Sequence, residues 1–194
     1  MKWVGILITF LVFLSSCGVL QNNGVVYRLY KDVPDTAFVY SLPFAKGTSH
    51  PVWQGYHSLF SHWGNYAVDF RMKPGTVIHA ARSGVVAEIR DSFKAGGVGM
   101  RYVGKENAVI IRHHDNTYAH YLHVQHKGVL VKKGDSVQQG QPIALSGHTG
   151  FSAFPHLHFE VTESPRKAAR EIPVRFRTEN GIEFLQPLRR YKAQ

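Results

Sequence analysis

Residues 154–160 read FPHLHFE, and this stretch predicts a β-strand with two unlike faces. Side chains alternate between the faces of a strand, so His156 and His158 point one way while Leu157 and Phe159 point the other. The apolar pair would pack into a core, and the two imidazoles would face a common point. Imidazole gains little from an apolar setting unless its ring nitrogens are bound. The stretch therefore predicts a strand that presents candidate metal-binding or catalytic side chains.

Further strand signals recur at short intervals before this stretch. Turn-forming pairs such as Pro74-Gly75 and Ser83-Gly84 separate short apolar or alternating segments. Asp115-Asn116 lies between two such segments and predicts a hairpin. The sequence therefore predicts a mainly β domain, either an antiparallel β-sandwich or a partly open barrel with short loops. The expected strands are 66–70, 76–81, 85–90, 108–113, 117–122, 129–132, 141–145 and 156–162.

Length and charge limit the class of protein. The chain has 194 residues and 44% hydrophobic content, which suits one domain plus a short appendage. The formal charge of +10 favours an anionic partner. Because the basic residues are spread along the chain and form no helix or block, we expect an acidic surface and no nucleic acid as the partner.

The N-terminus resembles a bacterial lipoprotein signal. An apolar run of twelve residues, Trp3 to Leu14, suits the core of a signal peptide and is too short to span a bilayer. It leads into Leu-Ser-Ser-Cys at 14–17, and Cys17 is the only cysteine of the chain. The resemblance implies that residues 1–16 are removed and that Cys17 carries a lipid. The alternative is that Cys17 is one more apolar residue of the signal.

A lipid on Cys17 would place the protein in the bacterial cell envelope. Several acyl chains anchor a protein firmly, since each buried methylene contributes about 0.8 kcal/mol. Gly18 stands where an aspartate is associated with retention in the inner membrane, so the outer membrane is expected in a cell with two membranes. Residues 17–40 would form the lipidated N-terminus, the tether and a segment that wraps over the main domain.

The chain has 12 histidines, so setting and spacing must separate functional from structural ones. Asp69 lies between Val68 and Phe70 in an apolar strand, where a carboxylate is costly to bury unless it is paired or bound to a metal. A hydrogen-bonded carboxylate at a strand end is the alternative. His120, on a hairpin strand, is either a satisfied, partly buried histidine or a catalyst. Six others are expected in solvated loops or at edges, namely His50, His57, His79, His123, His126 and His148.

Three of these side chains together would suit zinc. A catalytic zinc site takes three imidazole or carboxylate ligands and keeps one position open. His62, Asp69 and one histidine of the 156/158 pair supply that set. The other histidine of the pair and His120 would remain free to move protons.

Several ordered blocks resemble the lysostaphin/LytM-type zinc endopeptidases of bacterial cell walls. The blocks are FSHWGNYAVDF (60–70), KPGTVIHAARSGVV (73–86), NAVIIRH (107–113), YAHYLHV (118–124), KKGDSVQQGQPIALSGHTGFS (132–152) and PHLHFEV (155–161). The resemblance covers about residues 41–165 and implies a metallopeptidase domain over 41–194 with its core at 60–162. It also implies peptidoglycan as the substrate.

Carried over by position, the resemblance makes His62, Asp69 and His158 the zinc ligands and His120 and His156 the catalytic histidines. The chain has no His-Glu-x-x-His motif, so a histidine must take the proton from the attacking water. Glu160 shares a face with the histidine pair and either orients an imidazole or is a structural charge. Two alternatives remain for the function. One is a catalytically silent, lipid-anchored wall-binding protein or amidase regulator, and the other is an endopeptidase for a non-wall peptide.

Overall fold

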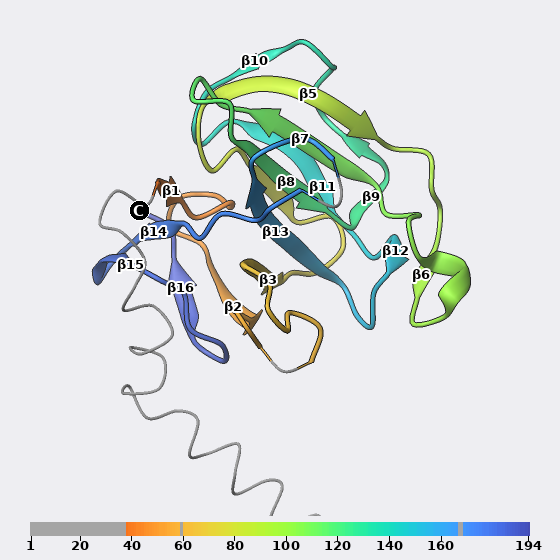
Figure 1. Ribbon diagram of the computed structural model, residues 1–194, viewed down its shortest axis with the longest axis horizontal. Coiled ribbons are helices and arrows are strands. Elements are labelled where there is room, and N and C mark those ends of the chain that lie inside the picture. Colours follow the sequence, from red (N-terminus) through yellow and green to blue (C-terminus); the bar gives the residue numbers. More distant parts are fainter. Residues whose placement is uncertain (1–37, 59, 167–168) are drawn as a thin grey trace, which may run out of the picture. The chain divides into compact units, whose positions relative to one another are not determined.

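The computed structural model describes residues 38–194 apart from 59 and 167–168, so the predicted signal peptide, Cys17 and most of the tether lie outside the described residues. The described part is built from strands and one 3-10 turn, which confirms the mainly β prediction (Figure 1). It contains no helix long and apolar enough to cross a membrane. The elements are β1 (Val39–Ser41), β2 (Ser49–Gln54), β3 (Ala67–Arg71), β4 (Val77–His79), β5 (Gly84–Arg90), β6 (Gly96–Gly97), η1 (Met100–Tyr102), β7 (Ala108–Arg112), β8 (Tyr118–Leu122), β9 (Val124–Val129), β10 (Ser136–Val137), β11 (Pro142–Ser146), β12 (Gly150–Phe151), β13 (His156–Thr162), β14 (Arg175–Thr178), β15 (Gly181–Glu183) and β16 (Arg190–Lys192).

The largest sheet has eight strands in the order β10-β5-β7-β8-β13-β3-β2-β16, and every neighbouring pair is antiparallel. In Figure 1 this sheet runs from β10 and β5 at the top to β2 and β16 at the bottom. β7 and β8 form the predicted hairpin, in which the backbone N–H of His113 donates to Thr117 over 2.9 Å. Asn116 in the turn has φ of 61°, a conformation that asparagine tolerates better than most residues.

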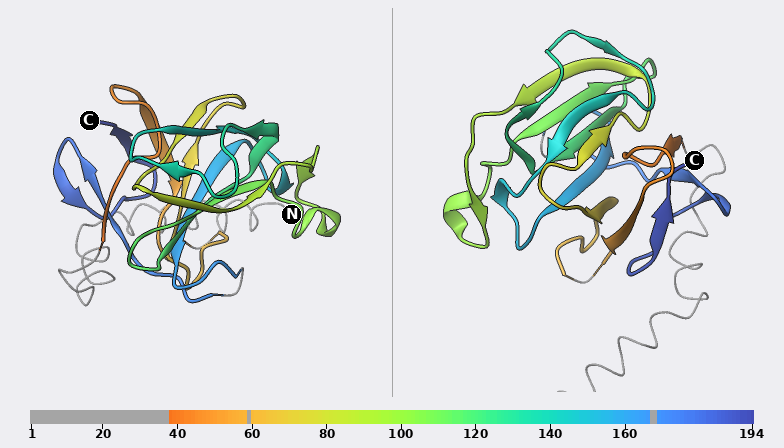
Figure 2. Two further views of the ribbon diagram at one scale, coloured as in Figure 1. Left: turned by 90° about the horizontal axis from the view of Figure 1, so that it is seen from above. Right: turned by 180° about the vertical axis from the view of Figure 1, so that it is seen from behind.

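Smaller sheets complete the domain. β4, β11 and β9 form an antiparallel three-stranded sheet. The Tyr121 hydroxyl of β8 accepts a hydrogen bond of 2.8 Å from the backbone N–H of Ala81, just after β4, and so ties this sheet to the large one. β1 pairs in parallel with β14, and β6 pairs in parallel with β12. Figure 2 shows the green segment that contains β6 on the side of the domain away from the blue C-terminal strands.

The core lies on one face of β13, as the alternation of residues 156–160 predicts. Leu157 and Phe159 are buried, and the Phe159 ring meets the rings of Tyr40, Tyr121 and Phe176 edge-on. His156, His158 and Glu160 alternate with these residues and therefore lie on the opposite face of the sheet. The apolar face fixes the strand, and the polar face carries the candidate site.

The structure differs from the sequence prediction in two places. The strand expected at 129–132 lies instead at β9, because the chain turns at Lys132–Asp135 with Gly134 at φ of 92°. Lys127 within β9 has a positive φ of 57°, which removes the two-residue period that marks a strand in the sequence. The expected strands also do not include β2, which is an inner strand of the main sheet.

Candidate metal centre

His62, Asp69 and His158 converge on one point. One ligand atom from each lies within 4.8 Å of the other two. Asp69 and His158 are directly opposite each other on β3 and β13, so the sheet register sets their separation. His62 arrives from the loop before β3, and its Nε2 lies 3.3 Å from Asp69 Oδ1. The seven-residue spacing between His62 and Asp69 is therefore compatible with a shared ion.

The protonation of His62 suits a metal ligand. Its Nδ1 lies 3.2 Å from the carbonyl oxygen of Gly55, which can only accept, so Nδ1 carries the proton. The lone pair of a neutral ring is then on Nε2. This atom is buried and has no hydrogen-bond partner among the described residues. A buried nitrogen lone pair without a donor, 3.3 Å from a carboxylate oxygen, fits a cation between them.

Asp69 is the centre of the cluster. It is 2% exposed, and its Oδ2 accepts a hydrogen bond of 2.7 Å from Gln54 Nε2. Its Oδ1 lies 2.9 Å from His158 Nδ1 and 3.6 Å from His156 Nε2. Burial would raise the pKa of Asp69, but the adjacent imidazoles of His158 and His62 hold it well below its usual range. The carboxylate is therefore ionised and oriented.

His158 lies between two carboxylates. Its Nδ1 lies 2.9 Å from Asp69 Oδ1, and its Nε2 lies 3.2 Å from Glu160 Oε2. Burial would lower the pKa of His158, but these two acceptors raise it to about 10. Burial would likewise raise the pKa of Glu160, and His158 lowers it. Two negative charges around one imidazole would also attract a divalent cation.

His123, His156 and His158 form a second group of ligand atoms within 4.8 Å of one another. Nδ1 of His123 donates to the Thr149 carbonyl over 2.7 Å, and Nδ1 of His156 donates to the Phe154 carbonyl over 2.7 Å. The Nε2 lone pairs of both neutral rings are therefore free to accept a proton. Burial lowers the pKa of His123 to about 3, and burial also lowers the pKa of His156.

The two groups differ in charge. The first contains Asp69, whose carboxylate offsets part of the charge of a divalent ion, and the second contains imidazoles alone. Since buried charge needs compensation, the first group is the better metal site. His123 and His156 are then left beside it as neutral bases.

The structure does not bring His120 into either group. In the register of β8 against β13, His120 is opposite Glu160, and its Nε2 lies 2.8 Å from Thr162 Oγ1. His123, expected from the sequence to be solvated, is 8% exposed and lies against His156 with ring centroids 4.6 Å apart. It follows β8 with φ of 62°, and this left-handed residue ends the strand alternation. The sequence signal for His123 was weak, since it depends on that turn.

Exposed aromatic side chains flank the site on the His62 loop. Phe60 is 79% exposed and Trp63 is 75% exposed. Tyr121 of β8, in contrast, is fully buried in the core. Large exposed apolar side chains beside a buried polar cluster are typical of a surface that binds a ligand.

Comparison with known proteins identifies the family of the chain. The sequence pattern described as peptidase family M23 matches residues 64–170. The peptidoglycan DD-endopeptidase ShyA of Vibrio cholerae is 34% identical over 142 residues, which are 73% of this chain and 29% of ShyA. Lysostaphin of Staphylococcus simulans is 37% identical over 97 residues, which are 50% of this chain and 17% of lysostaphin. The chain thus spans less than a third of the length of these relatives.

One solved structure resembles this chain over almost the whole length of the solved domain. The catalytic domain of the prophage-encoded M23 protein EnpA from Enterococcus faecalis, solved in a mutant form, is 25% identical and superimposes with a TM-score of 0.52. The alignment covers 67% of this chain and 94% of the EnpA domain. The antiparallel fold, the His/Asp cluster and the matched sequence pattern lead to one assignment: the chain belongs to peptidase family M23, a family of metallopeptidases.

Proposed function

We propose that this protein is a zinc endopeptidase that hydrolyses peptide bonds in the stem peptides or cross-bridges of peptidoglycan. The observation that carries the proposal is the convergence of His62, Asp69 and His158 on one point, with the buried Nε2 of His62 lacking a hydrogen-bond partner among the described residues. ShyA and lysostaphin, both relatives over part of this chain, support the choice of reaction.

The three residues would hold the metal through one carboxylate oxygen and two imidazole nitrogens, a donor set that zinc prefers. Bound there, zinc would supply Lewis acidity that activates a water and polarises the scissile carbonyl. Glu160 acts on this site through His158, because its carboxylate accepts from Nε2 and fixes the ring plane. Gln54 similarly fixes the carboxylate of Asp69.

His123 and His156 are the proposed proton carriers. Both are held by backbone carbonyls at Nδ1, so each presents Nε2 as an acceptor. Burial lowers the pKa values of both rings, which keeps them neutral and leaves their Nε2 lone pairs available at neutral pH. The ring that accepts the proton of the attacking water at Nε2 becomes a donor, and it would then deliver that proton to the leaving amine. We propose His123 here in place of His120, whose Nε2 is engaged by Thr162.

The proposed substrate fits the charge and surface of the chain. Peptidoglycan stem peptides carry free carboxylates, and the protein has a formal charge of +10. Phe60 and Trp63 stand exposed next to His62, where an extended peptide would pass. We further propose that Cys17 is lipidated and holds the enzyme at a membrane of the cell envelope, which would keep it close to the wall.

The decisive experiment measures zinc and hydrolysis on the same preparations. Purified protein, His158→Ala and Asp69→Ala would be analysed for bound zinc and incubated with purified murein. His114→Ala, a change at an exposed histidine outside the cluster, serves as the control. We expect about one zinc and new muropeptides for the unchanged protein and the control, and neither for the two variants. Bound zinc without released fragments would favour the regulator alternative. Hydrolysis that persists in Asp69→Ala would contradict the proposed ligand set.

A further inference from the structure

The segment 93–105, outside the metal centre, is a basic surface. It contains Lys94, Arg101 and Lys105 and no acidic residue. None of the three cations forms an ion pair within the part of the chain that the structure describes. The acidic residues at its two ends are already engaged. Asp91 accepts from the Gly128 N–H over 2.9 Å, and Glu106 lies 3.5 Å from Arg90 Nη1.

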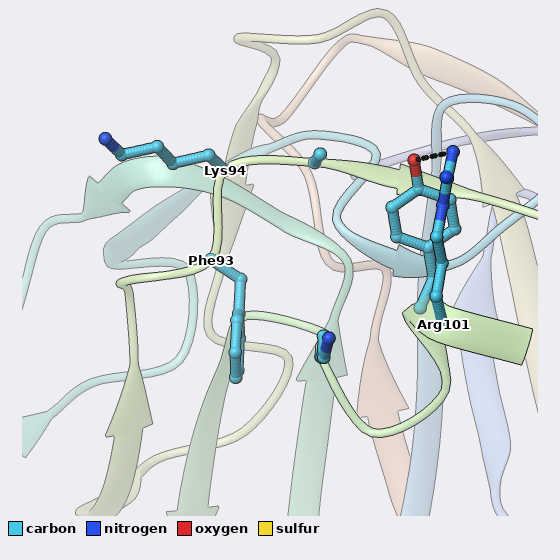
Figure 3. A pocket seen from close by; sticks show the side chains of 6 residues that line it. Phe93, Lys94 and Arg101 are labelled. Carbon is cyan, nitrogen blue, oxygen red and sulfur yellow. Dashed lines mark hydrogen bonds between the residues drawn. The ribbon is translucent and has the colours of Figure 1, made fainter.

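A shallow pocket of about 250 Å³ lies within this segment, lined by Phe93, Lys94, Ala95, Arg101, Tyr102 and Lys105. Its walls are apolar and its rim is cationic. The Arg101 guanidinium lies 4.8 Å from the centre of the Tyr102 ring and donates to the Tyr102 hydroxyl over 3.0 Å. Figure 3 shows Phe93 and Arg101 on opposite sides of this pocket and Lys94 reaching outward. Because Arg101 is stacked in place, it can bind an anion without first losing side-chain freedom.

The base of the segment is connected to His123 by hydrogen bonds. The Asn107 side chain accepts from Phe93 N over 2.9 Å and donates to Phe93 O over 2.8 Å. The Asn107 N–H in turn donates to Thr149 Oγ1 over 2.9 Å. The carbonyl of Thr149 is the group that orients His123. Asn107 and Thr149 thus link Phe93 of the pocket wall to a proposed proton carrier.

A second connection leads to His156. β6 pairs with β12, and the Ser152 N–H donates to the Gly97 carbonyl over 3.1 Å. The Ser152 hydroxyl lies 3.3 Å from Nδ1 of His156. The approach of the two strands is so close that a Cβ on Gly96 would collide with the His148 carbonyl oxygen. The basic segment is therefore held firmly against the stretch 148–152, which positions both imidazoles.

We infer that the segment 93–105 is a substrate subsite that binds a carboxylate-bearing part of the peptidoglycan peptide, with an apolar portion of the same ligand in the pocket. The inference rests on the proposed function and adds a subsite that recognises the negative charge of the substrate. Three cations that lack an ion-pair partner among the described residues surround an apolar pocket, and this arrangement matches an anionic ligand with an apolar body. Hydrogen bonds connect the segment to Thr149 and Ser152, which contact the two proposed proton carriers. This connection favours a ligand that binds the segment and also extends to the reacting bond. An anionic membrane is the other anionic partner, and its binding is measured below.

The test replaces the three cations and leaves the metal centre intact. Lys94→Gln/Arg101→Gln/Lys105→Gln would be compared with Lys132→Gln/Lys133→Gln/Arg177→Gln, which removes the same charge from exposed positions elsewhere. The zinc-loaded proteins would be titrated with a disaccharide–tetrapeptide muropeptide and with the same compound after amidation of its carboxylates. We expect the first variant to bind the free-carboxylate form about tenfold more weakly, which matches the loss of one or two charge-assisted contacts. The control should change less than about twofold.

Measuring hydrolysis distinguishes a failure of the subsite inference from a failure of the proposed function. On murein, the first variant should show a raised KM with little change in kcat and unchanged zinc content, since the cations bind substrate without touching the reacting atoms. Equal binding of the free and amidated muropeptides, or an equal loss in the control variant, would overturn the inference. The inference would also be overturned if the first variant bound the muropeptides normally and lost only its co-sedimentation with vesicles of anionic phospholipid. If the unchanged protein binds zinc but never cleaves murein, the proposed function fails, and the contrast between the two muropeptides still decides the subsite.

Discussion

Comparing His123→Ala with His120→Ala tests the assignment of the proton carriers most directly. The two histidines are three positions apart at the end of the same strand, but they contact different groups. His123 packs against His156 beside the proposed ligands, whereas His120 bonds to Thr162. Both side chains are buried, so each replacement opens a comparable cavity and each serves as a control for the other.

The two variants should differ in activity rather than in stability. A positioned general acid or base contributes about 10²–10⁴-fold to a rate, so His123→Ala should lower kcat by that factor. This corresponds to about 3–5 kcal/mol of transition-state stabilisation. His120→Ala loses one buried hydrogen bond and some packing, which should cost about 1–3 kcal/mol of unfolding free energy. Its kcat should fall less than about tenfold.

The assay is single-turnover or steady-state hydrolysis of a defined cross-linked muropeptide, with bound zinc and the denaturation midpoint measured on each sample. Zinc content should stay near that of the unchanged protein in both variants, because neither residue belongs to the group of His62, Asp69 and His158. If His120→Ala loses activity by the larger factor while His123→Ala stays active, the geometric reasoning is refuted. The role would then return to the residue that the family resemblance implied.

Three further changes probe the surroundings of the site, the attachment of the basic segment and the β7–β8 turn. Glu160→Gln should weaken zinc binding about 10–100-fold in a chelator competition, because the carboxylate at Nε2 of His158 is lost; an unchanged affinity would make Glu160 a structural charge. Gly96→Ala should lower activity and protease resistance of the segment 93–105, since the new methyl meets the His148 carbonyl; unaltered activity would show that the attachment is dispensable. Burial raises the pKa of Asp115, but Thr117 and Arg82 outweigh it and lower the pKa to about 2. Because this folded-state pKa lies below the ordinary value, the stabilisation of about 1 kcal/mol is complete above about pH 4 and is lost as the pH falls towards 2. Asp115→Asn should therefore lower the melting temperature at pH 6 and have little effect near pH 2, and an equal effect at both would contradict the assignment.

Local patterns were sufficient to predict much of the fold. The alternation in β3, β5, β7, β8 and β13 follows directly from burial of one face, and the Asp115-Asn116 turn joins β7 to β8 as expected. Burial of Leu157 and Phe159 likewise places His156 and His158 on the opposite face. Strands with irregular backbone were harder, and β9 was misplaced because Lys127 breaks its period.

The proposed site was less accessible from the sequence, because it depends on register between distant strands. That Asp69 meets His158, and His120 meets Glu160, is a property of the pairing of β3, β13 and β8. His123 joins the cluster only because its left-handed backbone turns it out of the strand pattern. The basic segment 93–105 showed no periodic signal, and its pairing through β6 and β12 is formed by residues more than fifty positions apart.

The opposition of Asp69 and His158 across β3 and β13 also ties formation of the proposed metal site to folding of the sheet. The two residues are 89 positions apart in the chain, and only closure of the central sheet brings them within 2.9 Å. Slippage by a single residue along this strand pair would turn one of them to the wrong side. A nascent or mispaired chain therefore cannot assemble the proposed metal site. Binding of the metal ion would then indicate that β3 and β13 are correctly paired.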